Sequence, residues 1–481
     1  MNKNTLFFAS AQIAERLVSF FMLPLLTNLV SRVEYAIWSQ SIVISGILIP
    51  LVLLGFNTAT IKFFPIWEGQ EKTRKSVLLL MLSSVLIVMT VISSLAILSG
   101  RNTASLIFGD ADQYMYIPVL AGLLLSEALF EMLVAVLRAS NHIQRIAVYL
   151  LLKGVWRISI FLLVLAGTSG GFYKAFWVFV LFQLTVTIAL YVKDVGLAAL
   201  IRSGIGPGRN QWNEVFRFSL PLVPLAALTA ANNFVDRLFL THLYGLETLA
   251  VYSAAFSMAA IAAFFYSVLG FTLFPVLSKL WAGDDKEGAA VLMRKAFIIY
   301  LSLLLPFICF IAVIGGDVLL LLTSKDYLMP DYLLLLLSCN MGLFGIYQIA
   351  FYIFLLERGS AQAPFLMGGV VAANIFFNIL LVPEYGMQGA ALAGCISNAL
   401  LAGLFLHKSQ QISKWEFPWS AALKITVRAV SVGTLIWFID RWLGSYSPIV
   451  LVLMLVCCGL VYVLLDYCDQ RTSFFSVIRS N

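Results

Sequence analysis

Charged side chains stand within stretches of this chain that are otherwise apolar. Glu127 and Glu131 occur in one such stretch, and Lys153 and Arg157 occur in the next. The members of each pair are four residues apart, which places them on one face of a helix. Ionisable groups within a membrane span are costly to bury and commonly mark the path of a substrate or an ion. The cations of this quartet could attract an anion, or the four charges could simply neutralise one another.

The two helices that carry the quartet are predicted to form an antiparallel hairpin that turns near Asn141. In such a hairpin, Glu131 should lie at the depth of Lys153, and Glu127 at the depth of Arg157. At a rise of 1.5 Å per residue, the pairs would lie on the order of 16 Å and 22 Å from the turn, well inside a bilayer. This register predicts two ion pairs, while a structural and a functional role both stay open.

Two arginines each follow an acidic residue, in the predicted first helix of each half of the chain. These dipeptides are Glu15-Arg16 and Asp236-Arg237. Adjacent residues on a helix point about 100° apart, so each acid is poorly placed to neutralise the arginine beside it. A guanidinium can bind phosphate oxygens through two parallel hydrogen bonds, whereas a lysine acts as a point charge. We expect both arginines to line a central cavity.

An internal repeat supports this expectation. The blocks Ala36-Ile37-Trp38-Ser39, Leu54-Gly55-Phe56 and Trp67-Glu68-Gly69 recur as Ala250-Val251-Tyr252-Ser253, Leu269-Gly270-Phe271 and Trp281-Ala282-Gly283. In a hydrophobic chain, a parallel duplication of this length is typical of a transporter that is built from two similar halves around a central pathway.

Composition indicates a polytopic membrane protein. Of the 481 residues, 61% are hydrophobic and 11% are charged, and the mean hydropathy is +0.95. Apolar runs of about 20 residues can cross roughly 30 Å of hydrocarbon. They predict an all-α integral membrane protein with about fourteen transmembrane helices, near residues 5–30, 35–61, 76–98, 114–137, 146–167, 173–192, 215–241, 248–277, 290–314, 330–356, 363–382, 388–406, 420–439 and 448–467.

This pattern predicts two six-helix lobes and two C-terminal helices. The predicted parts are an N-lobe at 1–200, a cytoplasmic linker at 201–214, a C-lobe at 215–410, and the last two helices with a cytoplasmic C-terminus at 411–481. Lys and Arg are concentrated in the connections on the side of the N-terminus, so both termini are expected in the cytoplasm. The net charge of +7 follows from this topology, and nucleic acid is not an expected partner.

Enzymatic chemistry is not indicated. The sequence has no G-x-x-x-x-G-K-[ST] motif, no Cys/His spacing typical of a metal site, and no evident Ser/His/Asp arrangement. The predicted connections are too short to form a separate catalytic domain. We therefore expect neither a metal nor an organic cofactor.

Polar amides form a secondary signal. Asn374 and Asn378 share one face of a predicted helix and could bind sugar hydroxyls. Amides within membrane spans more often join neighbouring helices, and this is the favoured interpretation.

Two segments show a resemblance to a known family. The run Leu23-Pro24-Leu25-Leu26-Thr27-Asn28-Leu29-Val30-Ser31-Arg32-Val33-Glu34-Tyr35-Ala36 resembles the first-helix signature of the polysaccharide transporter family. Asp236-Arg237-Leu238, followed by Tyr244-Gly245 and Ala250-Val251-Tyr252-Ser253, resembles its counterpart in the second half. This family includes the Wzx-type O-antigen flippases of the multidrug/oligosaccharidyl-lipid/polysaccharide (MOP) superfamily. The resemblance covers essentially the whole chain.

The resemblance implies a flippase of the bacterial inner membrane that serves O-antigen, and hence lipopolysaccharide, or related polysaccharide synthesis. Its substrate would be an undecaprenyl-pyrophosphate-linked oligosaccharide, moved by alternating access from the cytoplasmic to the periplasmic leaflet. Implied partners are this lipid-linked oligosaccharide, membrane lipids, a polysaccharide polymerase and a chain-length regulator.

The resemblance also suggests roles for the residues singled out above. Arg16 and Arg237 would hold the pyrophosphate, with Lys153 and Arg157 as secondary contacts. Candidate sites for a coupling proton or sodium ion are Glu15, Glu127, Glu131 and Asp236, and candidate glycan contacts are Asn374 and Asn378.

Three alternatives stay open at this level. A drug or cation antiporter of the same superfamily would share the lobes, although acids should dominate its cavity. A flippase for the peptidoglycan precursor would share the lipid pyrophosphate. A membrane polysaccharide polymerase or ligase belongs to a different class, and the short predicted loops argue against it.

Overall fold

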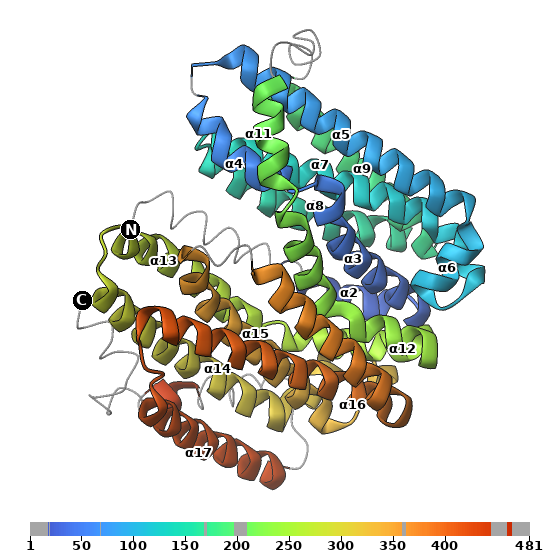
Figure 1. The fold of residues 1–481 in the computed structure, drawn as a ribbon. Coiled ribbons are helices and arrows are strands. Elements are labelled where there is room, and N and C mark those ends of the chain that lie inside the picture. Colours follow the sequence, from blue (N-terminus) through green and yellow to red (C-terminus); the bar gives the residue numbers. More distant parts are fainter. Residues whose placement is uncertain are drawn as a thin grey trace. The chain divides into compact units, whose positions relative to one another are not determined.

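The described part of the protein is built from helices. The computed structural model describes residues 18, 20–67, 69–167, 171–196, 209–357, 362–443 and 459–463, and every regular element in these ranges is helical (Figure 1). In these ranges, eleven helical segments are long and apolar enough to cross a membrane. The predicted all-α membrane fold is therefore confirmed. The count of fourteen stays a prediction, because the predicted first and last spans lie mostly outside the described residues.

The chain divides into two compact units, Met1–Ala250 and Val251–Asn481. The division falls within a helix, so the helix that opens the predicted second half belongs largely to the first unit. The predicted lobe and linker boundaries stay predictions. The elements of the first unit are α2 (Met22–Leu29), α3 (Arg32–Leu53), α4 (Phe56–Ile66), α5 (Glu71–Leu98), α6 (Gly100–Phe108), η1 (Ala111–Tyr116), α7 (Ile117–Ala139), α8 (Ile143–Gly167), α9 (Gly171–Leu190), η2 (Tyr191–Val195), α11 (Arg209–Ser219) and α12 (Leu222–Ala259), which continues into the second unit.

The second predicted span consists of two helices, α3 and α4. A capping box starts α3: the Ser31 side chain accepts from the Glu34 N–H at 3.3 Å, and the Glu34 carboxylate accepts from the Ser31 N–H at 2.9 Å. The break comes at Leu54 and Gly55, which have φ angles of 50° and 72°. A Cβ atom on Gly55 would lie 2.6 Å from the carbonyl oxygen of Ser219. Glycine therefore permits both the left-handed turn and the close approach of α11.

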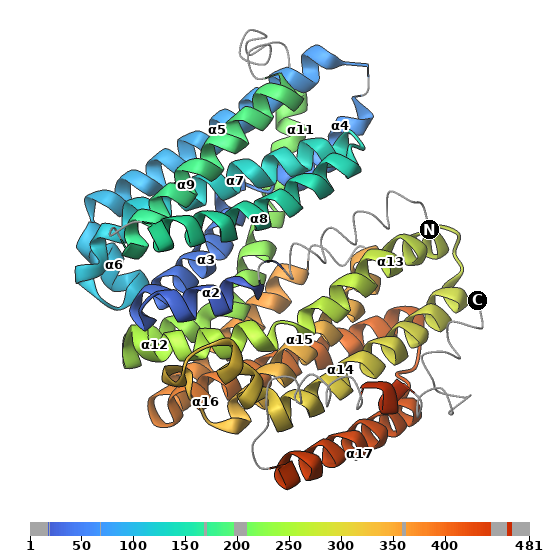
Figure 2. The ribbon, with the colours of Figure 1, turned by 180° about the vertical axis from the view of Figure 1, so that it is seen from behind.

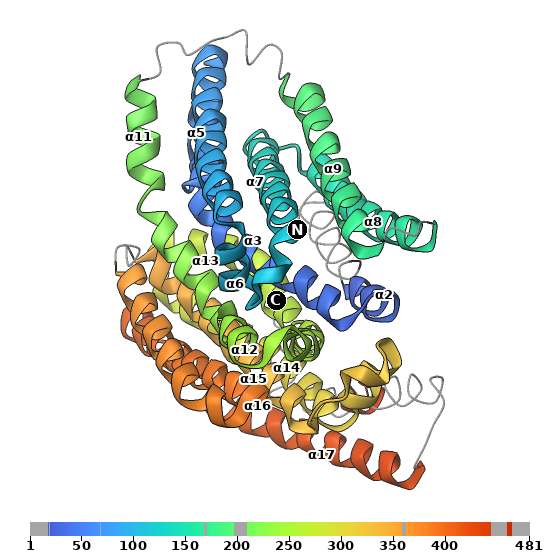
Figure 3. The ribbon, with the colours of Figure 1, turned by 90° about the vertical axis from the view of Figure 1, so that its right-hand side faces the viewer.

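Helix α7 lies in the interior of the first unit. It packs against α9, α4 and α3, with α5 alongside (Figures 1 and 3). An aromatic cluster joins α3 to α8 and α9, because the Trp38 ring lies 5.0 Å from that of Phe161 and 5.2 Å from that of Phe176. Buried rings thus fix α8, which carries the two cations of the charged quartet, against α3 and α9.

Contacts between helix ends agree with the predicted alternation of sides. Arg32 follows the first predicted span and Glu247 follows the seventh, so both are expected on the outward side. They form an ion pair of 2.7 Å. Arg145 and Asp194, both placed in cytoplasmic connections, form another of 2.8 Å. Which side faces the cytoplasm stays a prediction from the distribution of Lys and Arg.

The second unit consists of the end of α12 and of α13 (Ala262–Ala282), α14 (Lys286–Leu322), η3 (Lys325–Tyr327), α15 (Asp331–Leu356), α16 (Ala363–Ser413) and α17 (Trp419–Leu443). Helix α15 packs along α16, and α14 along α17 (Figure 2). Gly386 interrupts α16 with φ 53° and ψ −128°, so this element comprises two arms that match the predicted spans 363–382 and 388–406. Ile314, Val432 and Tyr462 share a core that joins α14, α17 and the turn at 459–463.

The repeated blocks occupy related positions in the two units. Trp67 and Gly69 stand at the connection from α4 to α5, and Trp281 and Gly283 at the connection from α13 to α14. The helix breaks differ, however. Leu54-Gly55 separates α3 from α4, whereas α12 and α13 separate at residues 260–261 and Gly270 lies inside α13. The duplication therefore preserves the turns better than the interior of the spans.

The close approach at Gly55 generates a stability prediction. Gly55→Ala should lower the midpoint of thermal unfolding of the purified protein, because the new methyl group would meet the Ser219 carbonyl in a left-handed backbone, at a cost of about 1–3 kcal/mol. Two substitutions serve as controls. Gly69 also has a positive φ, but an added Cβ would meet no atom within 4 Å, and Gly403 has neither a positive φ nor a neighbour within 4 Å of an added Cβ. We expect the order of loss Gly55 > Gly69 > Gly403. Equal midpoints for the first two would show that contact with α11 contributes nothing.

The topology is tested by labelling introduced cysteines in intact cells, in a variant that lacks the six native cysteines. Gly283→Cys should react only after permeabilisation, and Asn102→Cys should react from outside. A Cβ on Gly283 would meet only ordinary contacts, the nearest at 3.5 Å, and Asn102 is exposed, so neither change should disturb the fold. The opposite labelling pattern would invert the topology.

Candidate functional site

A buried ion pair connects α7 and α8. Lys153 Nζ lies 2.5 Å from Glu127 Oε2, and Gln183 Nε2 on α9 donates to Glu127 Oε1 at 3.0 Å. The Lys153 ammonium also lies 4.5 Å from the centroid of the Phe130 ring, which adds a cation–π contact. Lys153 is 7% exposed and Gln183 is fully buried. Both oxygens of the Glu127 carboxylate therefore have a donor, as a charge inside a membrane protein requires.

The predicted partner of Lys153 is wrong by one helical turn. The sequence paired Lys153 with Glu131, but the ion pair is formed with Glu127. The prediction assumed that α7 and α8 form an aligned hairpin. Instead, the contact of α7 with α9 is much more extensive than its contact with α8. The amide of Gln183 on α9 also binds Glu127. Depth in a simple hairpin therefore does not decide which acid the lysine meets.

The other two members of the quartet lie one turn away on their helices. Arg157 is half-buried and interacts electrostatically with Glu127. Glu131 is exposed on α7 and interacts electrostatically with Lys153. The cluster thus extends from a buried ammonium to an exposed carboxylate, and its two acids balance its two cations.

The first helix lies close to this cluster. A Cβ atom on Gly154, the residue after Lys153, would come within 2.8 Å of Val18 Cγ1. Helix α2 also contacts α8. Glu15 and Arg16 lie outside the described residues, and their predicted roles stay predictions.

Arg237 and Asp236 are buried within the first unit. The Arg237 guanidinium donates from Nη1 to Ser39 Oγ on α3 at 3.1 Å and lies 5.4 Å from the centroid of the Phe234 ring. Asp236 Oδ1 accepts the Arg237 backbone N–H at 2.9 Å. Arg237 is 5% exposed and Asp236 is 4% exposed. In this conformation they connect α12 to α3, so lining a cavity would require these helices to move apart.

The amides proposed as glycan contacts lie in the second unit. Asn378 Nδ2 donates to Asn374 Oδ1 at 2.7 Å within α16, and both side chains are buried. Nearby in the sequence, Asn398 Nδ2 donates to Asn340 Oδ1 at 2.5 Å and thereby joins α16 to α15. The second bond matches the helix-joining role that the sequence favours for such amides. A glycan role for Asn374 and Asn378 stays a prediction.

Sequence reasoning missed Gln183. It is the polar amide within the strongly apolar run of α9, and the rule that drew attention to Glu127 could have found it. A second missed group is Asp194 on η2, whose side chain is 1% exposed. It pairs with Arg145 at 2.8 Å and accepts from the Tyr149 hydroxyl at 2.6 Å. This contact holds the end of α9 to α8.

The described residues contain no group of three or more His, Cys, Asp or Glu that could hold a metal ion. The three cysteines in these ranges, Cys309, Cys339 and Cys395, are free thiols. The chemistry of the candidate site therefore depends on the carboxylates, the ammonium, the guanidinium and the amide of the cluster.

Solved structures with the same fold are membrane transporters. The lipid II flippase MurJ in an inward closed conformation superposes with a TM-score of 0.77 at 16% identity, covering 97% of this chain and 99% of MurJ. An inward-facing multidrug resistance MATE transporter of the MOP superfamily gives 0.65 at 14% identity, covering 83% and 98%. The protein therefore has the fold of the MOP superfamily, as the sequence predicted.

The sequence gives the family. The pattern of the polysaccharide biosynthesis protein family matches residues 1–281, and the chain belongs to this family. Capsular polysaccharide biosynthesis protein CapF of Staphylococcus aureus is 27% identical over 205 residues, covering 41% of this chain and 50% of CapF. The probable low-salt glycan biosynthesis flippase Agl15 of Haloferax volcanii is 22% identical over 233 residues, covering 47% and 49%. The chain spans about half the length of these relatives.

The observed register can be tested by a double-mutant cycle on thermal unfolding. Lys153→Met should destabilise the protein by several kcal/mol, because it leaves the Glu127 carboxylate buried without its cation. Adding Glu127→Gln should recover much of this loss, since the amide needs no counter-charge and can still bind Gln183. Glu131→Gln is the matched control and should couple to Lys153→Met much more weakly, because Glu131 is exposed and forms no direct ion pair with Lys153. Strong coupling to Glu131 and none to Glu127 would restore the register predicted from sequence.

Proposed function

We propose that this protein is a flippase for an oligosaccharide linked to a lipid pyrophosphate. The observation that carries the proposal is the charged cluster around the Lys153–Glu127 ion pair, in a chain of the polysaccharide biosynthesis family with a MOP transporter fold. A glycan and a pyrophosphate cannot cross hydrocarbon unaided, because their desolvation is prohibitive. Cations inside the spans offset that cost, and the lipid tail stays in the bilayer.

The ion pair suggests how a phosphate is accepted. Lys153 is held by Glu127, and Glu127 keeps a second donor in Gln183. When a phosphate approaches, the ammonium can exchange the carboxylate for a phosphate oxygen without leaving Glu127 unpartnered. Arg157 adds a second positive charge one turn away. A proton or a sodium ion at Glu127 or Glu131 would then compensate the released carboxylate and couple transport to an ion gradient.

The finer parts of the proposal follow from the family resemblance. The lipid would be undecaprenyl pyrophosphate, and the direction would be from the cytoplasmic to the periplasmic leaflet of a bacterial inner membrane. Related structures in inward closed and inward-facing conformations support alternating access as the mechanism. A polymerase and a chain-length regulator are the proposed downstream partners.

Other members of the superfamily are distinguished by charge. The acids and cations of the quartet balance, whereas a cation antiporter should have an excess of acid. A likeness of 16% identity to the lipid II flippase carries the fold and not the substrate. The sugar attached to the lipid therefore separates this proposal from a peptidoglycan-precursor flippase.

Reconstituted vesicles with a labelled lipid-linked oligosaccharide provide the test. Lys153→Ala should lower the rate at which the label reaches the opposite leaflet by about tenfold or more, while Lys153→Arg should keep part of the rate because the positive charge is retained. Lys174→Gln, which removes an exposed lysine in α9, is the matched control and should translocate normally. Protein abundance and unfolding midpoints are measured in parallel.

Two results would contradict the proposal. One is normal translocation by a well-folded Lys153→Ala, Arg157→Ala protein. The other is a cell without this protein in which single repeat units still reach the opposite leaflet but are no longer polymerised. That result would indicate a polymerase.

A further inference from the structure

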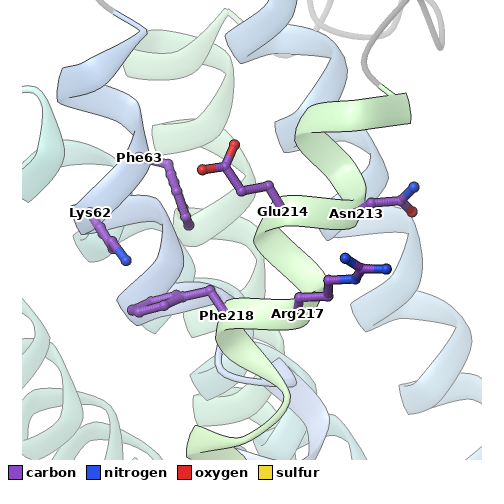
Figure 4. A pocket seen from close by; sticks show the side chains of 6 residues that line it. All are labelled: Lys62, Phe63, Asn213, Glu214, Arg217 and Phe218. Atoms are coloured by element: carbon purple, nitrogen blue, oxygen red, sulfur yellow. The ribbon is translucent and has the colours of Figure 1, made fainter. Parts of the chain in front are cut away.

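A second polar site lies between α4 and α11, on the first unit and away from the charged cluster. It is a pocket of about 470 Å³ lined by Lys62, Phe63, Asn213, Glu214, Arg217 and Phe218 (Figure 4). Lys62 and Phe63 come from α4, and the other four residues come from α11. Figure 4 shows the Lys62 ammonium directed toward the Phe218 ring and the Glu214 carboxylate directed toward α4.

The walls of this pocket are fixed by packing. The Phe63 and Phe218 rings meet edge to face at 5.5 Å, and the Phe56 and Trp212 rings lie 5.4 Å apart. The close approach at Gly55 adds a third contact between the two helices. Packing therefore fixes the position of α4 relative to α11, and with it the backbone that frames the pocket.

Its charged groups are available to a ligand. Among the described residues, the side chains of Lys62, Glu214 and Arg217 form no ion pair and no hydrogen bond, and all three are exposed. Lys62 Nζ lies 3.8 Å from the centroid of the Phe218 ring, which holds the ammonium in place. Charges of both signs thus line one pocket without neutralising each other directly.

The surroundings match the interface between hydrocarbon and headgroups. Lys62 is one turn from Ile66, which is 65% exposed, and α11 continues through the 45% exposed Leu220 toward the membrane helix α12. Trp212, near the start of α11, is half-buried, and tryptophan is enriched at this depth of a membrane protein. An acyl chain could follow the apolar surface while its headgroup occupies the pocket.

We propose that this pocket binds the headgroup of a phosphatidylethanolamine-type membrane lipid. Lys62 binds the phosphate, and Glu214 accepts hydrogen bonds from the primary ammonium, while the Arg217 guanidinium is directed away from α4 (Figure 4). A purely anionic headgroup would meet Glu214 unfavourably. A choline group has no N–H to donate, and the Phe218 face that could hold it is already occupied by Lys62.

Lipid retention by the purified full-length protein, measured by native mass spectrometry, tests this site. Wild type should retain phosphatidylethanolamine better than phosphatidylglycerol or phosphatidylcholine. Lys62→Gln should weaken the binding of phosphatidylethanolamine and phosphatidylglycerol alike by about three- to fivefold, because both headgroups carry the phosphate. Glu214→Gln should weaken only the ethanolamine lipid by a similar factor and so remove the preference over phosphatidylglycerol.

Matched controls are Lys72→Gln and Glu287→Gln, which change exposed charges outside the pocket and should bind lipid as wild type does. The proposal is overturned if the control variants lose as much lipid as the pocket variants, or if Glu214→Gln leaves the ethanolamine preference intact. No translocation is measured, so either outcome is independent of the flippase proposal.

Discussion

A charge inside a membrane protein is stable only while it has a partner, and this requirement organises the first unit. The ammonium of Lys153 and the carboxylate of Glu127 would each cost several kcal/mol to bury alone. Their pairing requires α7 and α8 to stay close, and Gln183 adds α9 to the same contact. The aromatic rings around Trp38 fix α3 against α8 and α9. A polar contact of this kind is strong while complete and can be reorganised only when another charge takes the place of one partner.

That property connects the fold to transport. The connections in the described ranges are short, so the polar groups that could handle a pyrophosphate are those within the spans. A phosphate offers Lys153 an alternative to Glu127, while Gln183 retains a hydrogen bond to the carboxylate that is left. Arg237 shows a related arrangement, because its guanidinium binds Ser39 on α3 and is buried in this conformation. Opening between α3 and α12 would expose it, and the unit therefore holds its candidate phosphate ligands in protected, partnered states.

The amount that sequence could predict differs between levels of structure. The all-α membrane fold and the positions of most spans followed from apolar runs, because the bilayer sets the length of a helix. The break at Leu54-Gly55 was not placed, since an apolar run continues through it and the cause is the approach of Ser219 from α11. Glu127, Lys153 and Arg157 were found because charges are conspicuous in such runs. The pairing of Lys153 was wrong because it depends on how α7 packs against α9, and no local pattern encodes that packing.

We propose that Lys153 exchanges Glu127 for a phosphate oxygen of the substrate. It is tested most directly by a cryo-electron microscopy structure of the full-length protein with a bound short-chain prenyl pyrophosphate oligosaccharide. We expect a phosphate oxygen within hydrogen-bond distance of Lys153 Nζ, with Glu127 held by Gln183 and no longer in contact with the ammonium. A bound pyrophosphate elsewhere, with the 2.5 Å contact between Lys153 and Glu127 intact, would contradict it.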